Sequence, residues 1–185
     1  MPRSYRVFKE LNYAYFITWT IVDWPNIFSE DLYCRIALDS LAFIRSYKKT
    51  ELNAFVLMPS HIHAILWPKD GINLSDVIRD FKRFTSRKIS NEAEKQNRID
   101  WLNRFTQARQ INRAHDVSKY QVWQEGSHPE AIYTENFAKQ KMDYIHLNPV
   151  RAGLVKTADE WPYSSARTYL LGEETYPPTD LLRVK

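Results

Sequence analysis

Residues 53–67 read NAFVLMPSHIHAILW, and this stretch decides the fold that we expect. Two apolar runs flank a Met-Pro-Ser turn, which predicts a β-hairpin with strands at 52–58 and 62–67. The second run opens with His61 and His63, separated by one isoleucine. Because side chains alternate between the two faces of a strand, both imidazoles should project from the same face, side by side.

This histidine pair has two explanations. Two neighbouring imidazoles on one face can chelate a divalent metal ion. Two histidines can also be ordinary polar side chains on the solvated face of a hairpin strand. A polar pair in so apolar a strand is a local exception that favours a site, but the three-residue pattern alone leaves both explanations open.

The segments around the hairpin predict a sheet with helices. Residues 13–24 are β-branched and aromatic on both faces, which is typical of a central strand. Apolar residues at helical spacing predict three helices. In chain order we expect strand 13–24, helix 31–48, strands 52–58 and 62–67, helix 74–88, strand 120–124 and helix 136–148. This is an α+β fold, a ferredoxin-like β-α-β-β-α-β sheet with helices on one face and an added C-terminal helix.

A length of 185 residues fits a single domain. We expect its core to span about residues 13–169. Residues 91–119 are polar and weakly periodic, so we expect an extended or partly helical insertion there. Residues 161–169 should form a short helical segment over the core, and residues 172–185, which contain two consecutive prolines, should form an irregular tail.

Composition excludes several classes of protein. The four glycines form no phosphate-binding pattern, which argues against a Gly-rich nucleotide loop. Cys34 is the single cysteine, so no disulfide can form within the chain. No apolar run reaches about 18 residues, and the first residues form no apolar signal region. We therefore expect a soluble cytoplasmic protein with no membrane-spanning segment.

Positive charge is concentrated in one part of the chain. The net charge is +4, yet residues 79–119 hold eleven lysines and arginines against five acidic residues. Arg79, Lys82, Arg83 and Arg87 recur at helical spacing, opposite the apolar side of their predicted helix. Such a stripe either binds a polyanion or is a solvated helix face, and charge alone favours neither.

A second group of candidate residues lies on the helix expected at 136–148. Tyr144 and Asn148 are four residues apart, so they share one face. A tyrosine hydroxyl can attack phosphorus when a metal polarises the phosphate, and an amide oxygen one turn away can be a further metal ligand. Tyr144 taken alone is more simply an amphipathic core residue. His146 points about 200° away around the helix, so we expect it to be structural or exposed.

Together these residues resemble the single-tyrosine HUH transposases, named for His, a hydrophobic residue and His. Within them the chain is most similar to the REP-associated tyrosine transposase branch, which is related to small insertion-sequence transposases. The resemblance is carried by VLMPSHIH at 56–63 and YIHLNPVRAGLV at 144–155, with support from FKRFTSR at 81–87, VWQEG at 122–126 and WPYSS at 161–165.

The resemblance implies metal-dependent cleavage and rejoining of single-stranded or hairpin-forming DNA through a 5′-phosphotyrosine intermediate. By position it implies that Tyr144 is the nucleophile and that His61 and His63 bind Mg²⁺ or Mn²⁺. Asn148 stands where related enzymes use a glutamine as third ligand, and Ser60 where an asparagine commonly precedes the first histidine. The basic stripe would then grip the DNA backbone.

Two other functions fit the same fold. The chain can be a non-catalytic nucleic-acid-binding module, or a metal-dependent phosphodiester hydrolase that uses water. The presence of His61, His63 and Tyr144 favours the DNA strand transferase. Monomer and homodimer are both compatible with the sequence.

Overall fold

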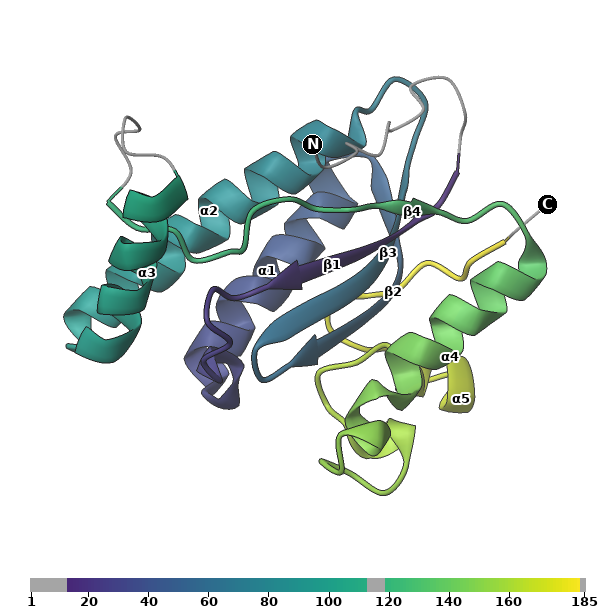
Figure 1. The fold of residues 1–185 in the computed structure, drawn as a ribbon. Coiled ribbons are helices and arrows are strands. Elements are labelled where there is room, and N and C mark those ends of the chain that lie inside the picture. The colour runs from purple at the N-terminus through teal and green to yellow at the C-terminus, as the bar shows by residue number, and fades with distance from the viewer. Residues whose placement is uncertain (1–12, 113–118, 184–185) are drawn as a thin grey trace.

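The computed structural model describes residues 13–112 and 119–183, and its centre is a four-stranded sheet (Figure 1). The strands are β1 (Tyr15–Thr20), β2 (Thr50–Met58), β3 (His61–Pro68) and β4 (Glu130–Ala131). Their order is β2-β3-β1-β4, and all neighbours are antiparallel. This order confirms the ferredoxin-like α+β fold predicted from the sequence.

Helices lie on both faces of the sheet (Figure 1). α1 (Asp31–Tyr47) and α2 (Leu74–Lys95) pack on one face, and α4 (Glu135–Arg151) packs on the other. The remaining elements are α3 (Ile99–Asn112), α5 (Ala166–Leu171) and the 3-10 turns η1 (Ile27–Ser29) and η2 (Ala158–Glu160). We expected the helices of the ferredoxin-like unit on one face of the sheet, and the added helix, which carries Tyr144, covers part of the other face.

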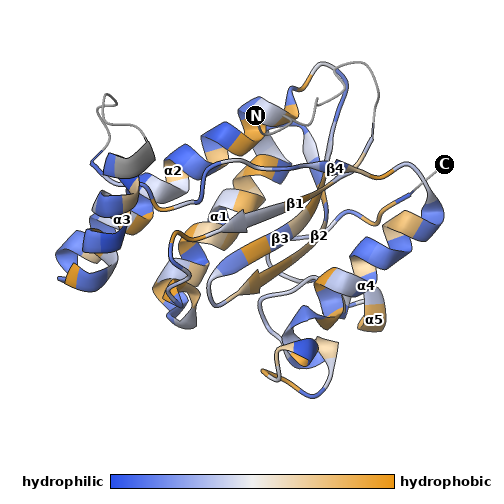
Figure 2. Cartoon of the chain, in the orientation of Figure 1, coloured by the Kyte–Doolittle hydropathy of each residue, from blue (hydrophilic) through white to orange (hydrophobic). Residues whose placement is uncertain are grey.

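Alternation along β3 explains why the core has two sides. Ile62 and Leu66 pack towards α1 and α2, whereas Ile65 packs with Phe16 of β1 and Ile145 of α4. Figure 2 shows the complementary pattern on the helices, where hydrophilic residues alternate with the apolar residues that face the sheet. Burial on both faces accounts for the high apolar content of the central strands.

The fourth strand does not lie where we predicted it. Residues 120–124 form only one isolated bridge beside the end of β1, between Ile21 and Trp123. Trp123 is buried and donates a hydrogen bond from Nε1 to Oγ1 of Thr85 on α2, at 2.8 Å. The β-like composition of this segment reflects its burial between β1 and α2, and the short β4 forms further along the chain.

α4 also runs further than predicted. We expected its end near Asn148, but the helix includes Pro149 and continues to Arg151. A proline removes a single backbone donor, its own. The last turn still closes, because the Ala152 N–H donates to the carbonyl of Asn148 at 3.0 Å.

The expected insertion at 91–119 is mostly helical. It contains the end of α2 and all of α3, while residues 113–118 lie outside the described part of the chain. Phe105 of α3 is fully buried in the core beside α1 and α2, so this segment belongs to the domain. None of the described helices combines the length and the apolarity needed to cross a membrane.

The C-terminal part lies along β2, the edge strand. Residues 172–183 contain no helix or strand, as expected for the tail. The Asp180 N–H donates to the Leu52 carbonyl at 2.9 Å, and the Asp180 carboxylate accepts two hydrogen bonds from Arg45. These contacts pair part of an edge that would otherwise present free backbone groups.

Candidate active site

The two histidines lie at the start of β3, directly after the two-residue turn of the hairpin. Within the β2–β3 ladder His61 pairs with Met58 and His63 with Val56, so both imidazoles project from the face covered by α4. Their ring centroids are 4.8 Å apart. The predicted side-by-side arrangement is therefore present in the structure.

His63 is held in one orientation. Its Nδ1 lies 2.8 Å from Oγ1 of Thr18, the residue opposite it on β1, and its ring stacks on Phe16 at 5.4 Å. The side chain is buried, and within the described structure its Nε2 has no hydrogen-bond partner. When Nδ1–H donates to Thr18, Nε2 carries a free lone pair, which is the arrangement of a metal-binding histidine.

Both imidazoles are neutral near physiological pH. Burial, together with the nearby His61 and Lys141 side chains, lowers the pKa of His63 to about 3. Burial also lowers the pKa of His61, whose Nδ1 lies 3.3 Å from Oγ of Ser60. A neutral imidazole is the form that binds metals. The burial that depresses the two pKa values therefore keeps both side chains competent as ligands.

Tyr144 meets the histidines from α4. Its ring makes an edge contact with His63, with centroids 5.0 Å apart, and a second edge contact with Phe16 at 5.8 Å. The buried neighbour Ile145 anchors this part of α4 to the sheet, and Tyr144 remains 38% exposed. The Tyr144 side chain therefore contacts His63 and is also accessible from solvent.

Asn148 lies one turn after Tyr144 and is half-buried. Across the described residues no hydrogen bond joins its side chain to either histidine, so its role as third ligand stays a prediction. The described part of the chain also contains no group of three or more His, Cys, Asp and Glu side chains arranged to hold a metal. A cation at the histidine pair would need a ligand of another kind, and an amide is one.

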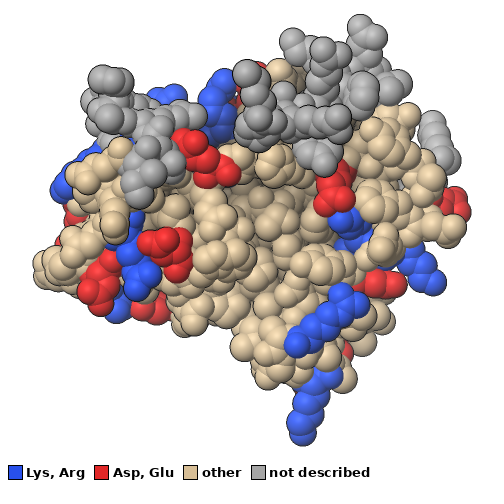
Figure 3. Space-filling view, viewed as in Figure 1, with Lys and Arg blue, Asp and Glu red and all other residues tan. Residues whose placement is uncertain are grey.

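Two cations beside Tyr144 did not emerge from the sequence. The Arg151 guanidinium lies 5.9 Å from the centroid of the Tyr144 ring. Lys141 Nζ lies 4.2 Å from the centroid of the Phe16 ring and forms a 2.8 Å ion pair with Glu130. Their spacing of three and seven residues from Tyr144 was visible in the sequence and places all three on one side of α4. In Figure 3, lysines and arginines project from the C-terminal part of α4 and from the loop after it.

His146, as expected, is structural. It is buried on the opposite side of α4, and its Nε2 lies 2.9 Å from Oγ of Ser165. Burial lowers the pKa of His146 to about 4. It therefore joins α4 to the segment before α5 and takes no part in the site.

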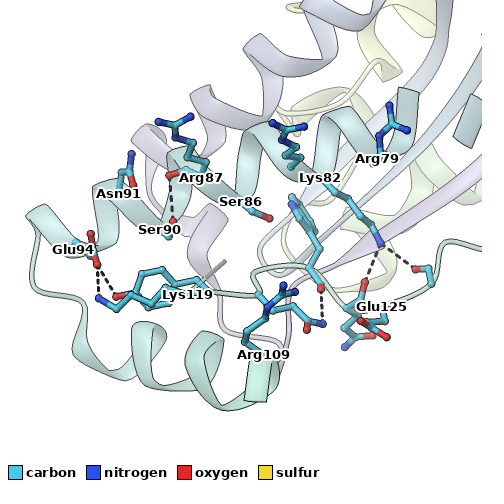
Figure 4. A pocket seen from close by; sticks show the side chains of 16 residues that line it. Arg79, Lys82, Ser86, Arg87, Ser90, Asn91, Glu94, Arg109, Lys119 and Glu125 are labelled. Atoms are coloured by element: carbon cyan, nitrogen blue, oxygen red, sulfur yellow. Dashed lines mark hydrogen bonds and ion pairs between the residues drawn. The ribbon is translucent and has the colours of Figure 1, made fainter. Parts of the chain in front are cut away.

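The predicted basic stripe lines a separate groove of about 780 Å³ between α2, α3 and residues 119–126 (Figure 4). Arg79 and Arg87 point away from α3, and Lys82 bends towards the chain near Glu125. Cationic side chains on its walls are Arg79, Lys82, Arg83, Arg87, Arg109 and Lys119.

The four stripe residues are not equivalent. Lys82 is half-buried and donates to the carbonyls of Gln124 and Gly126, at 2.9 and 3.1 Å, and burial lowers its pKa to about 8. Arg79 is paired with two aspartates of its own helix. Arg83 and Arg87 are exposed and form no side-chain hydrogen bond or ion pair with the described residues. These two arginines are the stripe residues available to a ligand.

Comparison with known proteins agrees with this geometry. Residues 11–125 match the family model described as "Transposase IS200 like". The chain belongs to the IS200-like transposase family. The matched segment contains the histidine pair and the basic stripe, whereas Tyr144 lies beyond it.

Two curated relatives of this family member are similar over part of its length. A REP-associated tyrosine transposase of Escherichia coli K12 is 30% identical over 117 residues, covering 62% of this chain and 53% of the relative. A putative REP-associated tyrosine transposase of Haemophilus influenzae is 27% identical over 130 residues, covering 66% of each. The matches thus span about half to two thirds of these relatives.

A solved structure shares the whole fold of this IS200-like protein. It is the structure of a REP-associated tyrosine transposase bound to a REP hairpin, and it has a TM-score of 0.62 and 21% identity to this chain. The superposition covers 100% of this chain and 96% of the other. The two proteins therefore share the same overall fold.

Proposed function

We propose that this protein cleaves and rejoins single-stranded DNA, through a covalent 5′-phosphotyrosine link to Tyr144. The observation that carries the proposal is the contact between the Tyr144 ring and the ring of His63, whose buried Nε2 has no hydrogen-bond partner among the described residues. Family membership and the names of the two curated relatives support the same chemistry. Hairpin-forming DNA is the proposed substrate, since the structural neighbour is bound to a REP hairpin.

The residues at the site fit a divalent cation. His61 and His63 would hold Mg²⁺ or Mn²⁺, with Asn148 as the proposed third ligand, and the buried unpaired Nε2 of His63 is the observation that supports this. All three ligands are neutral, so a bound ion keeps its charge for the substrate. Such an ion supplies Lewis-acid stabilisation of the charge on a phosphate oxygen.

The chain's own residues account for the rest of the reaction. The Tyr144 oxygen attacks phosphorus, an oxygen–phosphorus bond forms, and the bond from phosphorus to the 3′-oxygen breaks. The phenol proton passes to solvent, which reaches the exposed side chain, and the leaving oxygen takes up a proton to become a 3′-hydroxyl. Arg151, whose guanidinium lies over the Tyr144 ring, would hold the phosphate. Attack by a 3′-hydroxyl reverses the step without ATP, because the covalent link conserves the bond.

A gel experiment tests the proposal. The protein is incubated with a labelled single-stranded hairpin oligonucleotide and Mn²⁺, and the products are separated under denaturing conditions. We expect a label attached to the protein that disappears in Tyr144→Phe and in His61→Ala. Cleavage that persists in Tyr144→Phe would indicate a hydrolase that uses water, and binding without cleavage would indicate a nucleic-acid-binding module.

A second experiment tests the role of the basic stripe independently of DNA cleavage. We propose that Arg83 and Arg87 contact the DNA backbone, because they are the exposed and unpaired arginines of the stripe. Replacing both with alanine should reduce the slope of log affinity against log salt by about 0.7 to 0.9 for each lost contact. Arg79→Ala is the matched control, since Asp76 and Asp80 already neutralise Arg79. An unchanged slope in the double variant would remove the stripe from the interface.

A further inference from the structure

Trp24 is a large aromatic side chain that the proposed mechanism does not use. It follows β1 and is 55% exposed, although most tryptophans in this chain contribute to packing. Its ring makes an edge contact with His61, with centroids 5.7 Å apart. Trp24 therefore belongs to the rim of the candidate active site.

The backbone holds Trp24 there at a cost. Asp23 and Trp24 have φ of 56° and 57°, in the left-handed region that non-glycine residues rarely occupy. The Trp24 N–H donates to the Ile21 carbonyl at 3.1 Å, and the Ile21 N–H donates to the Ser60 carbonyl at 3.0 Å. The turn is thus fixed to the residue that precedes His61. Strain of this kind is found at functional sites, where surrounding structure maintains it.

Burial does not explain this conformation, because Trp24 is 55% exposed. The ring contacts instead form a continuous series from Trp24 to His61, then His63, then Tyr144, with centroid separations of 5.7, 4.8 and 5.0 Å. A DNA strand with its scissile phosphate at Tyr144 and the histidines would extend along this series. The nucleotide next to the phosphate would then reach the exposed indole.

We propose that Trp24 is a positioning residue that stacks on an unpaired base next to the scissile phosphate. This inference rests on the proposed function. Proteins that bind single strands commonly use exposed aromatic rings in this way, because every base has a flat face to stack on. This role would account for the strained backbone, since the left-handed turn at Asp23 and Trp24 fixes the position of the indole relative to His61.

A binding experiment in the Tyr144→Phe background tests this without requiring cleavage. The probe is a fluorescein-labelled hairpin oligonucleotide with unpaired flanks, and an abasic site replaces each flanking nucleotide in turn. Trp24→Leu keeps an apolar side chain but removes the flat ring, and should weaken binding by about 5- to 150-fold. Trp24→Phe should restore most of the affinity. Tyr47→Ala, which removes a 75% exposed aromatic on α1, is the control and should have no effect.

The abasic series provides the deciding readout. At one flanking position, the abasic site should weaken DNA binding by the Tyr144→Phe protein that keeps Trp24. The same abasic site should cause no further loss of affinity once Trp24→Leu is also present. If every abasic site weakens DNA binding by the same factor with and without Trp24→Leu, Trp24 stacks on no base and the inference is overturned. The binding experiment can also show that Trp24 is coupled to one abasic position while the wild-type protein cleaves no DNA. That result would keep this inference and reject the proposed reaction, so the two failures are distinguishable.

Discussion

Thr18→Val tests the geometry of the histidine pair with minimal change in shape. Thr18 Oγ1 lies 2.8 Å from His63 Nδ1 and is the side-chain partner that sets the direction of Nε2. Valine keeps the volume and β-branching of threonine but cannot form this hydrogen bond. The imidazole then loses the contact that fixes its tautomer and its rotation.

The expected magnitude follows from the role of such outer contacts. Removing the partner that orients a metal-binding histidine typically costs 10- to 100-fold in metal affinity. This corresponds to about 1.4 to 2.7 kcal/mol. His63 still stacks on Phe16 at 5.4 Å, so the ring stays near its position and complete loss of binding is not expected.

Mn²⁺ binding, measured by the decrease of the free-ion signal in electron paramagnetic resonance, is the assay. Thr20→Val is the matched control, because Thr20 lies opposite His61 on the same strand and no hydrogen bond joins their side chains in the described structure. We expect Thr18→Val to bind Mn²⁺ 10- to 100-fold more weakly than Thr20→Val. Equal affinity in both variants would show that Thr18 does not orient a ligand, and would refute the reasoning.

Two further predictions concern stability. Because burial lowers the pKa of His146 to about 4, the unfolded chain takes up this proton at higher pH than the folded chain, and the free energy of unfolding should fall by at most about 3 kcal/mol as pH decreases from 6.5 to 4. His146→Gln should remove this part of the pH dependence in urea denaturation. If the free energy of unfolding changes with pH in the same way in the variant and the wild type, His146 does not cause the effect. Asp180→Ala should lower the free energy of unfolding by about 1–3 kcal/mol, because Arg45 and the Leu52 N–H lose a charged acceptor. Glu174→Ala, an exposed change in the same tail, should be neutral in the same denaturation series.

The sequence predicted the parts of the fold that depend on local pattern. Two apolar runs around a Met-Pro-Ser turn predicted the hairpin, and the alternation of side chains along a strand predicted the shared face of the histidines; the register of β2 with β3 agrees with both. The strand predicted at 120–124 was wrong, because this segment makes only a single bridge with the end of β1 and forms no continuous ladder. Trp123 fills the space between β1 and α2, and nothing local distinguishes that from a strand.

The site was predicted where residue spacing carries the information and missed where tertiary contacts do. Tyr144 was placed on a helix and does meet His63, although its chemical role stays a prediction. In the sequence, Lys82 appeared as one of four equivalent cations. In the structure it donates hydrogen bonds to two backbone carbonyls that are distant in sequence. Trp24 could not be singled out, because its position depends on a left-handed turn and on a contact with the turn between β2 and β3.

The most direct test of the proposed chemistry is mass spectrometry of the covalent product. After reaction with hairpin DNA and Mn²⁺, nuclease trimming and trypsin digestion, residues 142–151 form one peptide that contains Tyr144 as its only tyrosine. We predict that this peptide carries a nucleotide joined through a 5′-phosphate to Tyr144. Cleaved DNA with a free 5′-phosphate and an unmodified peptide, or a nucleotide on another tyrosine, would contradict the account.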